Sequence, residues 1–203
     1  MTKLIALTGA SGVLGRHIAF LLAKKKIRTI ATSRTKMPFK NKYVKWEKFD
    51  LYKKFSHKIL DKKFKNSDVL IHAGAHVPIN SNIQNINKIT KTNIDATYTL
   101  YNWAKKNNVH FIFLSGAIVY KKTRGKIKEN SNFLTKKENI FYGYAKKICD
   151  VFFLKKIKKQ EKITILRPTS IYGWGMKKNK IITKILNSST KKKILNYINL
   201  LIR

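Results

Sequence analysis

A glycine-rich turn near the start of the chain is the first feature whose residue types and spacing could do chemistry. Residues 8–15 read Thr-Gly-Ala-Ser-Gly-Val-Leu-Gly and follow a short apolar run. This order predicts a strand that turns tightly at Gly9 and a helix that packs closely on the sheet through Gly15. The helix N-terminus then presents unpaired N–H groups and a positive dipole end to phosphates. We therefore expect a dinucleotide bound by Gly9, Ser11, Gly12, Val13, Leu14 and Gly15; a turn without a ligand is the alternative.

Two tyrosines carry a lysine four positions further on, Tyr101 with Lys105 and Tyr142 with Lys146. On a helix, residues four apart lie on one face. An ammonium group there favours the phenolate and lowers the pKa of the tyrosine, which can then act as a general acid or base. Lysine is abundant in this chain, so such pairs also arise by chance on exposed helices, and spacing alone does not choose between the two.

Polar and small residues follow other apolar runs. Asp50 and Leu51 end the third run, where a carboxylate can accept a hydrogen bond from an adenine amino group. The fourth run ends at His72 and is followed by residues small enough for a dinucleotide to lie close to the backbone, namely Ala73, Gly74 and Ala75. Asn93 falls early in the next helical stretch. We expect all of these except His72 to contact the cofactor, and His72 to be a packed, hydrogen-bonded imidazole.

The end of the second apolar run predicts which dinucleotide is bound. Folds that prefer NAD carry a carboxylate about 20 residues after the glycines, where it accepts from the ribose 2′-hydroxyl. Here Ser33 holds that place and Arg34 follows it. A guanidinium group can bind a phosphate through two donors. We therefore predict NADP, with NAD as the alternative; a solvated turn is the other interpretation of Arg34.

Apolar runs and helix-period stretches alternate along most of the chain. The runs expected to be strands are 3–7, 27–32, 43–46, 69–72, 109–114 and 163–166, and helices are expected over 13–25, 88–107 and 141–159. Segments 78–87 and 121–139 are expected to be loops. This alternation is typical of an α/β fold with a doubly wound, Rossmann-type parallel sheet, which binds its ligand at the carboxyl ends of the strands.

Composition limits the remaining classes. Lys and Arg number 45 against 9 Asp and Glu, for a formal net charge of +36. The lysines are spread along the whole chain, so we do not expect a specific nucleic-acid site, although a basic nucleic-acid-associated protein is kept as an alternative. The only cysteine, Cys149, fits a reducing compartment. No leader pattern, membrane-length run or metal-ligand spacing is found, so we expect a cytoplasmic protein without membrane or metal.

Taken in order, these motifs resemble the extended short-chain dehydrogenase/reductases, within them the NAD(P)-dependent epimerase/dehydratase family acting on nucleotide sugars. The resemblance covers about residues 3–175 and includes Leu114-Ser115-Gly116, Tyr142-Gly143-Tyr144-Ala145-Lys146 and Leu166-Arg167-Pro168. It implies an epimerase, dehydratase or ketoreductase serving surface polysaccharide synthesis. The protein would take a nucleotide-sugar substrate, and the nicotinamide would take up hydride.

The resemblance also assigns roles. The family's Tyr/Lys pair follows the fifth strand, and only Tyr142 does so; it would move the proton of a sugar hydroxyl, while Lys146 would also hold the nicotinamide ribose. Pro168 falls among the implied cofactor contacts. The family places its catalytic Ser or Thr where this chain has Gly116, and Ser115 lies one residue earlier, on the opposite face of an extended strand. Both a catalytic and a structural Ser115 are left open.

The C-terminal part departs from the family, whose members continue with a smaller domain that closes over the sugar nucleotide. We expect a dinucleotide-binding domain over 1–175 and, over 176–203, a basic tail or the start of a substrate lobe that is largely missing. Turnover would then be weak or absent, and an inactive cofactor-binding remnant is the alternative function.

The resemblance further implies a homodimer through the helices at 88–107 and 141–159. Candidate contacts on the first of these helices are Ile94, Tyr98, Tyr101 and Trp103. The alternative is that these side chains face the sheet.

Overall fold

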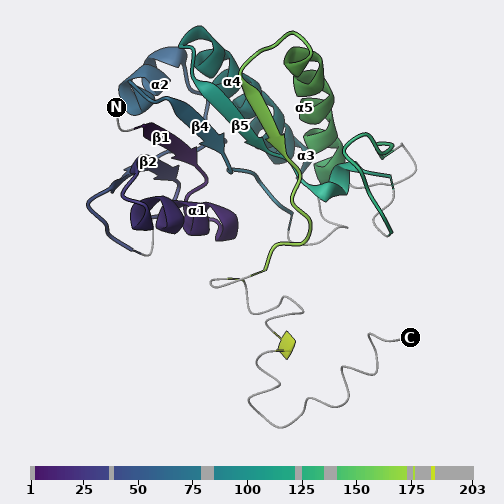
Figure 1. The fold of residues 1–203 in the computed structure, drawn as a ribbon, viewed down its shortest axis with the longest axis horizontal. Coiled ribbons are helices and arrows are strands. Elements are labelled where there is room, and N and C mark those ends of the chain that lie inside the picture. Colours follow the sequence, from purple (N-terminus) through teal and green to yellow (C-terminus); the bar gives the residue numbers. More distant parts are fainter. Residues whose placement is uncertain are drawn as a thin grey trace. The chain divides into compact units, whose positions relative to one another are not determined.

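A six-stranded parallel sheet organises the protein. The computed structural model describes residues 3–36, 39–78, 85–121, 125–134, 141–172, 176 and 184–185. Residues 1–170 form one compact unit, and residues 171–203 are grouped separately. Within the described part of the first unit, the strands pair in the order β3-β2-β1-β4-β5-β6 (Figure 1). The predicted doubly wound parallel sheet is therefore confirmed, whereas the predicted tail at 176–203 lies almost wholly outside the described residues.

The strands lie within a few residues of the predicted runs. They are β1 Leu4–Thr8, β2 Arg28–Ser33, β3 Val44–Lys48, β4 Val69–His72, β5 His110–Leu114 and β6 Ile163–Leu166. β1 pairs in parallel with both β2 and β4, so the strand order reverses direction at β1. In sheets of this kind, ligands bind beyond the carboxyl ends of the strands at such a reversal point. The ends of β1 and β4 therefore mark the expected ligand position.

Helices cover both faces of the sheet. They are α1 Val13–Lys24, α2 His57–Phe64, α3 Ile86–Ile89, α4 Ala96–Lys106 and α5 Phe141–Ile157. A π-helical turn, Thr90–Asp95, joins α3 to α4, and a short 3₁₀ turn, Ala117–Val119, follows β5. α1 lies on one side of the sheet, and α2, α4 and α5 lie on the other (Figure 1).

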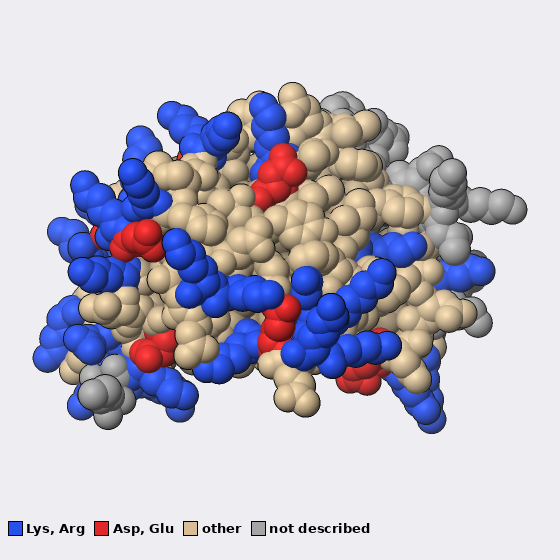
Figure 2. Space-filling view, turned by 90° about the horizontal axis from the view of Figure 1, so that it is seen from above, with Lys and Arg blue, Asp and Glu red and all other residues tan. Residues whose placement is uncertain are grey.

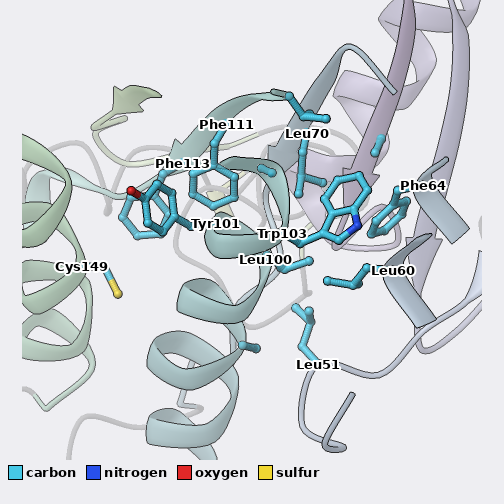
Figure 3. Packing of buried hydrophobic residues seen from close by; sticks show 14 of the residues in the cluster. Leu51, Leu60, Phe64, Leu70, Leu100, Tyr101, Trp103, Phe111, Phe113 and Cys149 are labelled. Atoms are coloured by element: carbon cyan, nitrogen blue, oxygen red, sulfur yellow. The ribbon is translucent and has the colours of Figure 1, made fainter. Parts of the chain in front are cut away.

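Alternation along the strands explains this two-sided burial. Ala6 faces the larger cluster, which α2, α4 and α5 complete, and the next residue, Leu7, faces the smaller cluster under α1. Aromatic side chains fill the larger cluster, where the Phe64 and Trp103 rings pack edge to face with centroids 5.8 Å apart (Figure 3). This core fixes the sheet from which the functional loops extend.

Two elements differ from the prediction. The sequence analysis missed α2, although its buried residues Leu60 and Phe64 are four positions apart, a helical signal hidden among lysines. The helix expected over 88–107 begins earlier, at Ile86, and contains the π-helical turn. No sequence period marks a π turn, which proteins use as a single-turn insertion, often at functional sites.

Two of the predicted dimer contacts are wrong. Tyr101 and Trp103 are each only 2% exposed in the core. The Trp103 indole donates to Asp61 Oδ1 at 2.7 Å, on the neighbouring helix α2. Both side chains thus face the sheet and its helices. Ile94 and Tyr98 are half-buried.

Basic side chains are abundant on the surface. Figure 2 shows Lys and Arg side chains spread over one face with Asp and Glu side chains among them, in line with the distribution along the sequence. Among the residues that the structure describes, no helix is long and apolar enough to cross a membrane.

Candidate functional site

A pocket opens at the carboxyl ends of β1, β2 and β4, where the topology places a ligand. Its walls come from the glycine turn, the end of β2, the segment after β3 and the segment after β4. Ten of the predicted cofactor residues line it: Gly9, Ser11, Gly12, Ser33, Arg34, Asp50, Leu51, Ala73, Gly74 and Ala75. The structure thus brings together segments that lie far apart in the sequence.

Two of the glycines are required by packing. Gly9 has φ +71°, and a Cβ there would lie 2.5 Å from the Gly74 Cα atom. A Cβ on Gly15 would lie 2.2 Å from the Gly9 carbonyl oxygen. Gly12 is less crowded; it occupies the N-cap of α1 and has no side chain with which to cap that helix. The pocket reaches the N-terminus of α1 at Gly12; Val13 and Leu14, predicted as cofactor contacts, follow in the first helical turn and are not among the residues that line it.

Thr92 is a pocket residue that the sequence analysis missed. It lies in the π-helical turn, is 7% exposed and lines the pocket. Its Oγ1 atom is buried and has no hydrogen-bond partner within the described part of the chain. A buried hydroxyl without a partner is costly, and a bound ligand would satisfy it. Together with the glycine cradle, this orphaned hydroxyl shows that the residues present fit a dinucleotide.

Asn93, predicted as a cofactor contact, instead holds the pocket wall. Its side chain is 1% exposed, accepts from the His76 N–H at 2.7 Å and donates to the His76 carbonyl oxygen at 2.9 Å. This bidentate clamp fixes the segment after β4, to which Ala73, Gly74 and Ala75 belong. Asn93 therefore bears on the pocket through the loop that it holds.

At the end of β2, the side chain available to a ligand in the pocket is that of Arg34 and not the hydroxyl of Ser33. The Ser33 hydroxyl donates to the Thr35 carbonyl oxygen at 2.6 Å and accepts from the Trp46 indole at 2.8 Å. Ser33 therefore lines the pocket with its hydroxyl already engaged. Arg34 is exposed and lines the same pocket.

His72 is the packed imidazole that the sequence predicts. It is fully buried between Thr8 Oγ1, 2.7 Å from Nδ1, and Thr97 Oγ1, 2.9 Å from Nε2. The Thr97 hydroxyl donates to the Asn93 carbonyl oxygen at 2.8 Å, which leaves it to accept from His72 Nε2–H. Burial, with a smaller contribution from Lys146, lowers the pKa of His72 to about 3. The imidazole is thus a neutral link between β1, β4 and α4. Among the described residues, no three His, Cys, Asp or Glu side chains form a group that could hold a metal ion.

Tyr142 and Lys146 lie in the first two turns of α5. Lys146 is 3% exposed, and its Nζ donates to the Leu114 carbonyl oxygen, 2.7 Å away at the end of β5. Burial lowers the pKa of Lys146 to about 8, although Cys149 and Asp150 act in the opposite direction. Burial also raises the pKa of Tyr142. The expected lowering of the Tyr142 pKa by Lys146 is therefore wrong for this structure, since desolvation is the dominant influence.

Ser115 points away from the pocket and toward α5. Its side chain is buried and donates a hydrogen bond to Asp150. Gly116, the position where the resemblance expects a hydroxyl, has extended backbone with φ 175°, and a Cβ there would meet no atom closer than 3.7 Å. The Pro168 carbonyl oxygen accepts from the Ala117 N–H at 2.9 Å and so fixes this loop. The geometry favours the structural interpretation of Ser115.

The second Tyr/Lys pair lies beyond the opposite end of the strands. The Tyr101 hydroxyl bonds to Glu161, and the Lys105 ammonium pairs with the same carboxylate at 3.1 Å. Burial and this carboxylate raise the pKa of Tyr101. Glu161 precedes β6 and thus lies at the amino ends of the strands. Tyr101 therefore has a structural partner and no connection to the glycine turn.

The fold and the pocket are those of a dinucleotide-binding protein. A family model described as the NAD dependent epimerase/dehydratase family matches residues 5–201, and the chain belongs to this family. A comparison with curated protein sequences finds no significant match.

Solved structures of similar fold include nucleotide-sugar enzymes. UDP-N-acetylglucosamine 4-epimerase from Methanobrevibacter ruminantium M1, in complex with UDP-N-acetylmuramic acid, is 22% identical with a TM-score of 0.77, covering 93% of this chain and 63% of its own. MoeE5 in complex with UDP-glucuronic acid and NAD is 19% identical with a TM-score of 0.75, and the match covers 91% of this chain and 60% of MoeE5. dTDP-glucose 4,6-dehydratase from Bacillus anthracis, in complex with NAD, is 16% identical with a TM-score of 0.75, and the match covers 93% of this chain and 62% of the dehydratase. This chain thus spans less than two thirds of their length.

Proposed function

We propose that this protein is an NAD(P)-dependent epimerase, dehydratase or ketoreductase of nucleotide sugars. One observation supports the proposal: the glycine-turn pocket and Lys146, which lies one helical turn after Tyr142, are both at the carboxyl ends of neighbouring strands. β1 ends in Thr8, which bonds to His72 at the end of β4, and Lys146 bonds to the end of β5. A dinucleotide that extends from Gly12 across these strand ends would present its nicotinamide end toward α5.

The residues of this chain divide the work between binding and proton transfer. Gly9, Gly12 and the first turn of α1 hold the pyrophosphate, and Thr92 offers its hydroxyl to the bound dinucleotide. Tyr142 takes and returns the proton of a substrate hydroxyl. Lys146 supplies positive charge beside that proton. The dinucleotide, when bound, supplies the hydride acceptor at its nicotinamide ring.

Within this function, we propose that NADP is preferred to NAD. The solved structures of MoeE5 and of the Bacillus anthracis dehydratase contain NAD, so the preference rests on this chain's own residues. Ser33 replaces the carboxylate that would repel a 2′-phosphate, and Arg34 lines the pocket beside it. A guanidinium group suits a phosphate because it donates through two parallel N–H groups.

We also propose that the protein forms a homodimer through α4 and α5. Ile148 on α5 is 44% exposed, and the α4 side that bears Tyr98 is half-buried. Light scattering at tens of micromolar is expected to show twice the monomer mass, and a stable monomer would end this proposal.

The test of function combines binding and turnover. NADPH and NADH are titrated into the purified chain by fluorescence, and a panel of UDP- and dTDP-hexoses is then followed for conversion. We expect saturable cofactor binding and slow conversion of at least one sugar, with Tyr142→Phe retaining the binding and losing the conversion. Cofactor binding without conversion of any sugar would contradict the enzymatic function, and salt-sensitive polyanion binding without cofactor binding would favour a nucleic-acid-associated protein.

A further inference from the structure

Asp150 is a buried carboxylate that the proposed mechanism leaves without a task. It lies on α5 one helical turn after Lys146 and is fully buried. Arg167, which follows β6, donates to its Oδ1 atom from Nη2 at 2.7 Å and from Nε at 3.1 Å. Ser115, at the end of β5, donates to its other oxygen. A buried carboxylate is tolerated when it is paired and hydrogen-bonded in this way.

The residues that bind Asp150 also contact the segments around α5. Arg167 Nη1 also donates to the Tyr120 hydroxyl at 2.9 Å and to the Glu129 carbonyl oxygen at 3.1 Å. Its guanidinium carbon lies 5.4 Å from the centroid of the Tyr120 ring and 5.3 Å from that of Phe133. Through this one carboxylate, α5 is joined to the ends of β5 and β6 and to the loop that follows β5.

Lys146 needs a counter-charge that its direct contacts do not supply. Its Nζ contacts the Leu114 carbonyl oxygen and lies 4.8 Å from the centroid of the Phe113 ring. A carbonyl and a ring attract a cation without neutralising it. The titratable groups that interact with it electrostatically are Cys149 and Asp150 on α5 and His72 on β4; next to these, Asp95 in the π-helical turn acts on Cys149, and Arg167 after β6 pairs with Asp150. Asp95 is exposed, so Asp150 is the buried carboxylate among these groups.

We propose that Asp150 is a positioning residue for the Tyr142–Lys146 pair: its carboxylate keeps Lys146 charged inside the protein and, through Ser115 and Arg167, fixes the strand ends beside that pair. The proposal rests on the proposed function, because charge on Lys146 matters for turnover only if this pair acts in catalysis. Replacing Asp150 by Asn leaves Lys146 and Arg167 as two buried cations. Of these, only the lysine can lose its proton in the accessible pH range.

A double-mutant cycle at two pH values tests this inference without any assay of activity. The chains compared are wild type, Asp150→Asn, Lys146→Met and the double variant, each unfolded by urea at pH 6.5 and pH 9.5. We expect the two residues to couple at pH 6.5 by about tenfold or more in the unfolding equilibrium, and much less at pH 9.5, where Lys146 is neutral in the folded protein. The matched control pairs Asp150→Asn with Arg167→Met and should couple equally at both pH values, because arginine stays charged.

The outcomes separate the possibilities. Coupling between Asp150 and Lys146 that is absent at pH 6.5, or the same at both pH values, overturns the proposal. If Asp150→Asn alone does not fold, the same cycle is run in the Arg167→Met background, where no arginine is left without its carboxylate. Where turnover is measurable, Asp150→Asn should move the alkaline limb of the pH profile to lower pH by about one pH unit, and Asp150→Glu should restore it. A chain that shows the coupling but no turnover contradicts the proposed function and leaves the Asp150 assignment standing.

Discussion

The indole of Trp46 on β3 donates a hydrogen bond of 2.8 Å to the hydroxyl of Ser33 at the end of β2. Because Ser33 also donates to the Thr35 carbonyl oxygen at 2.6 Å, its hydroxyl is committed within the protein. The group at this strand end that can reach toward a ribose substituent is therefore Arg34, which is exposed and lines the pocket. The proposed preference for NADP therefore depends on one side chain.

Replacing Arg34 with Ala should abolish most of the preference for NADP over NAD. The guanidinium is the expected partner of the 2′-phosphate, and hydrogen bonds to charged groups contribute about 1.5–3 kcal/mol. The measurement is the ratio of the two Kd values at moderate salt. Lys36→Ala, at another exposed cation beyond the same strand, controls for loss of general positive charge. An unchanged ratio in Arg34→Ala would show that Arg34 does not bind the phosphate.

Tyr142→Phe and Tyr101→Phe should separate turnover from stability. Removing an acid–base group costs about 10²–10⁴-fold in rate, so Tyr142→Phe should eliminate measurable turnover of the sugar converted by wild type. Tyr101→Phe breaks the bond to Glu161 at the far end of the strands, and should cost about 1–3 kcal/mol of stability with turnover nearly intact. The pair is compared by initial rates and urea unfolding. Similar loss of rate in both variants would show that the wrong tyrosine has been assigned to catalysis.

Introducing a hydroxyl at Gly116 should increase turnover. The backbone there is extended, and a Cβ would lie 3.7 Å from Ile118 Cγ2 and 3.9 Å from the Pro168 carbonyl oxygen, both ordinary contacts. Gly116→Ser therefore places a hydrogen-bond donor where the resemblance expects one, and we expect a gain of about tenfold or more. Gly116→Ala is the matched control, because it adds the Cβ alone. Equal rates in the two variants would argue against a catalytic hydroxyl at this position.

Gly15 should matter mainly for stability, and Gly12 mainly for cofactor binding. A Cβ on Gly15 would lie 2.2 Å from the Gly9 carbonyl oxygen, so Gly15→Ala forces backbone apart and should cost about 3 kcal/mol or more in the free energy of unfolding. On Gly12 the closest contact would be 3.2 Å. Gly12→Ala should therefore fold with a loss of about 1 kcal/mol and bind NADPH more weakly, since its methyl group approaches the pyrophosphate. Urea unfolding and fluorescence titration measure both effects; equal destabilisation would contradict this division.

Acid should destabilise the protein through His72. Burial lowers the pKa of this imidazole from 6.5 to about 3, so the folded protein binds fewer protons than the unfolded chain between these values. The contribution of neutral His72 to the free energy of unfolding is complete above about pH 6.5 and is lost as the pH falls toward 3. The loss is about 1.4 kcal/mol for each pH unit. His72→Gln removes the titration, so its stability relative to wild type should rise as the pH falls from 7 to 4.5 in urea unfolding. A difference in stability between His72→Gln and wild type that stays constant over this pH range would refute this role. The control variant is His57→Gln, on α2.

Local pattern was sufficient to predict the parallel sheet and most of the segments that line the pocket at the ends of its strands. The sheet follows from apolar runs separated by helical stretches, and the pocket follows from Gly9, Gly12 and Gly15 after the first strand. These features are readable because a strand, a tight turn and a close backbone approach are each determined by a few neighbouring residues. The order of motifs along the chain likewise separated Tyr142 from Tyr101, which spacing could not do.

Tertiary structure decided which distant side chains meet. The π-helical turn buries the Thr92 hydroxyl, which has no partner among the described residues, and directs the Asn93 side chain to the loop after β4. Ser115 bonds to Asp150, 35 positions away. Burial of Tyr142 raises its pKa, where the Tyr/Lys spacing predicted a lowered one. Hydrogen-bond partners and dielectric surroundings depend on packing between elements that are remote in sequence, so no local spacing specifies them.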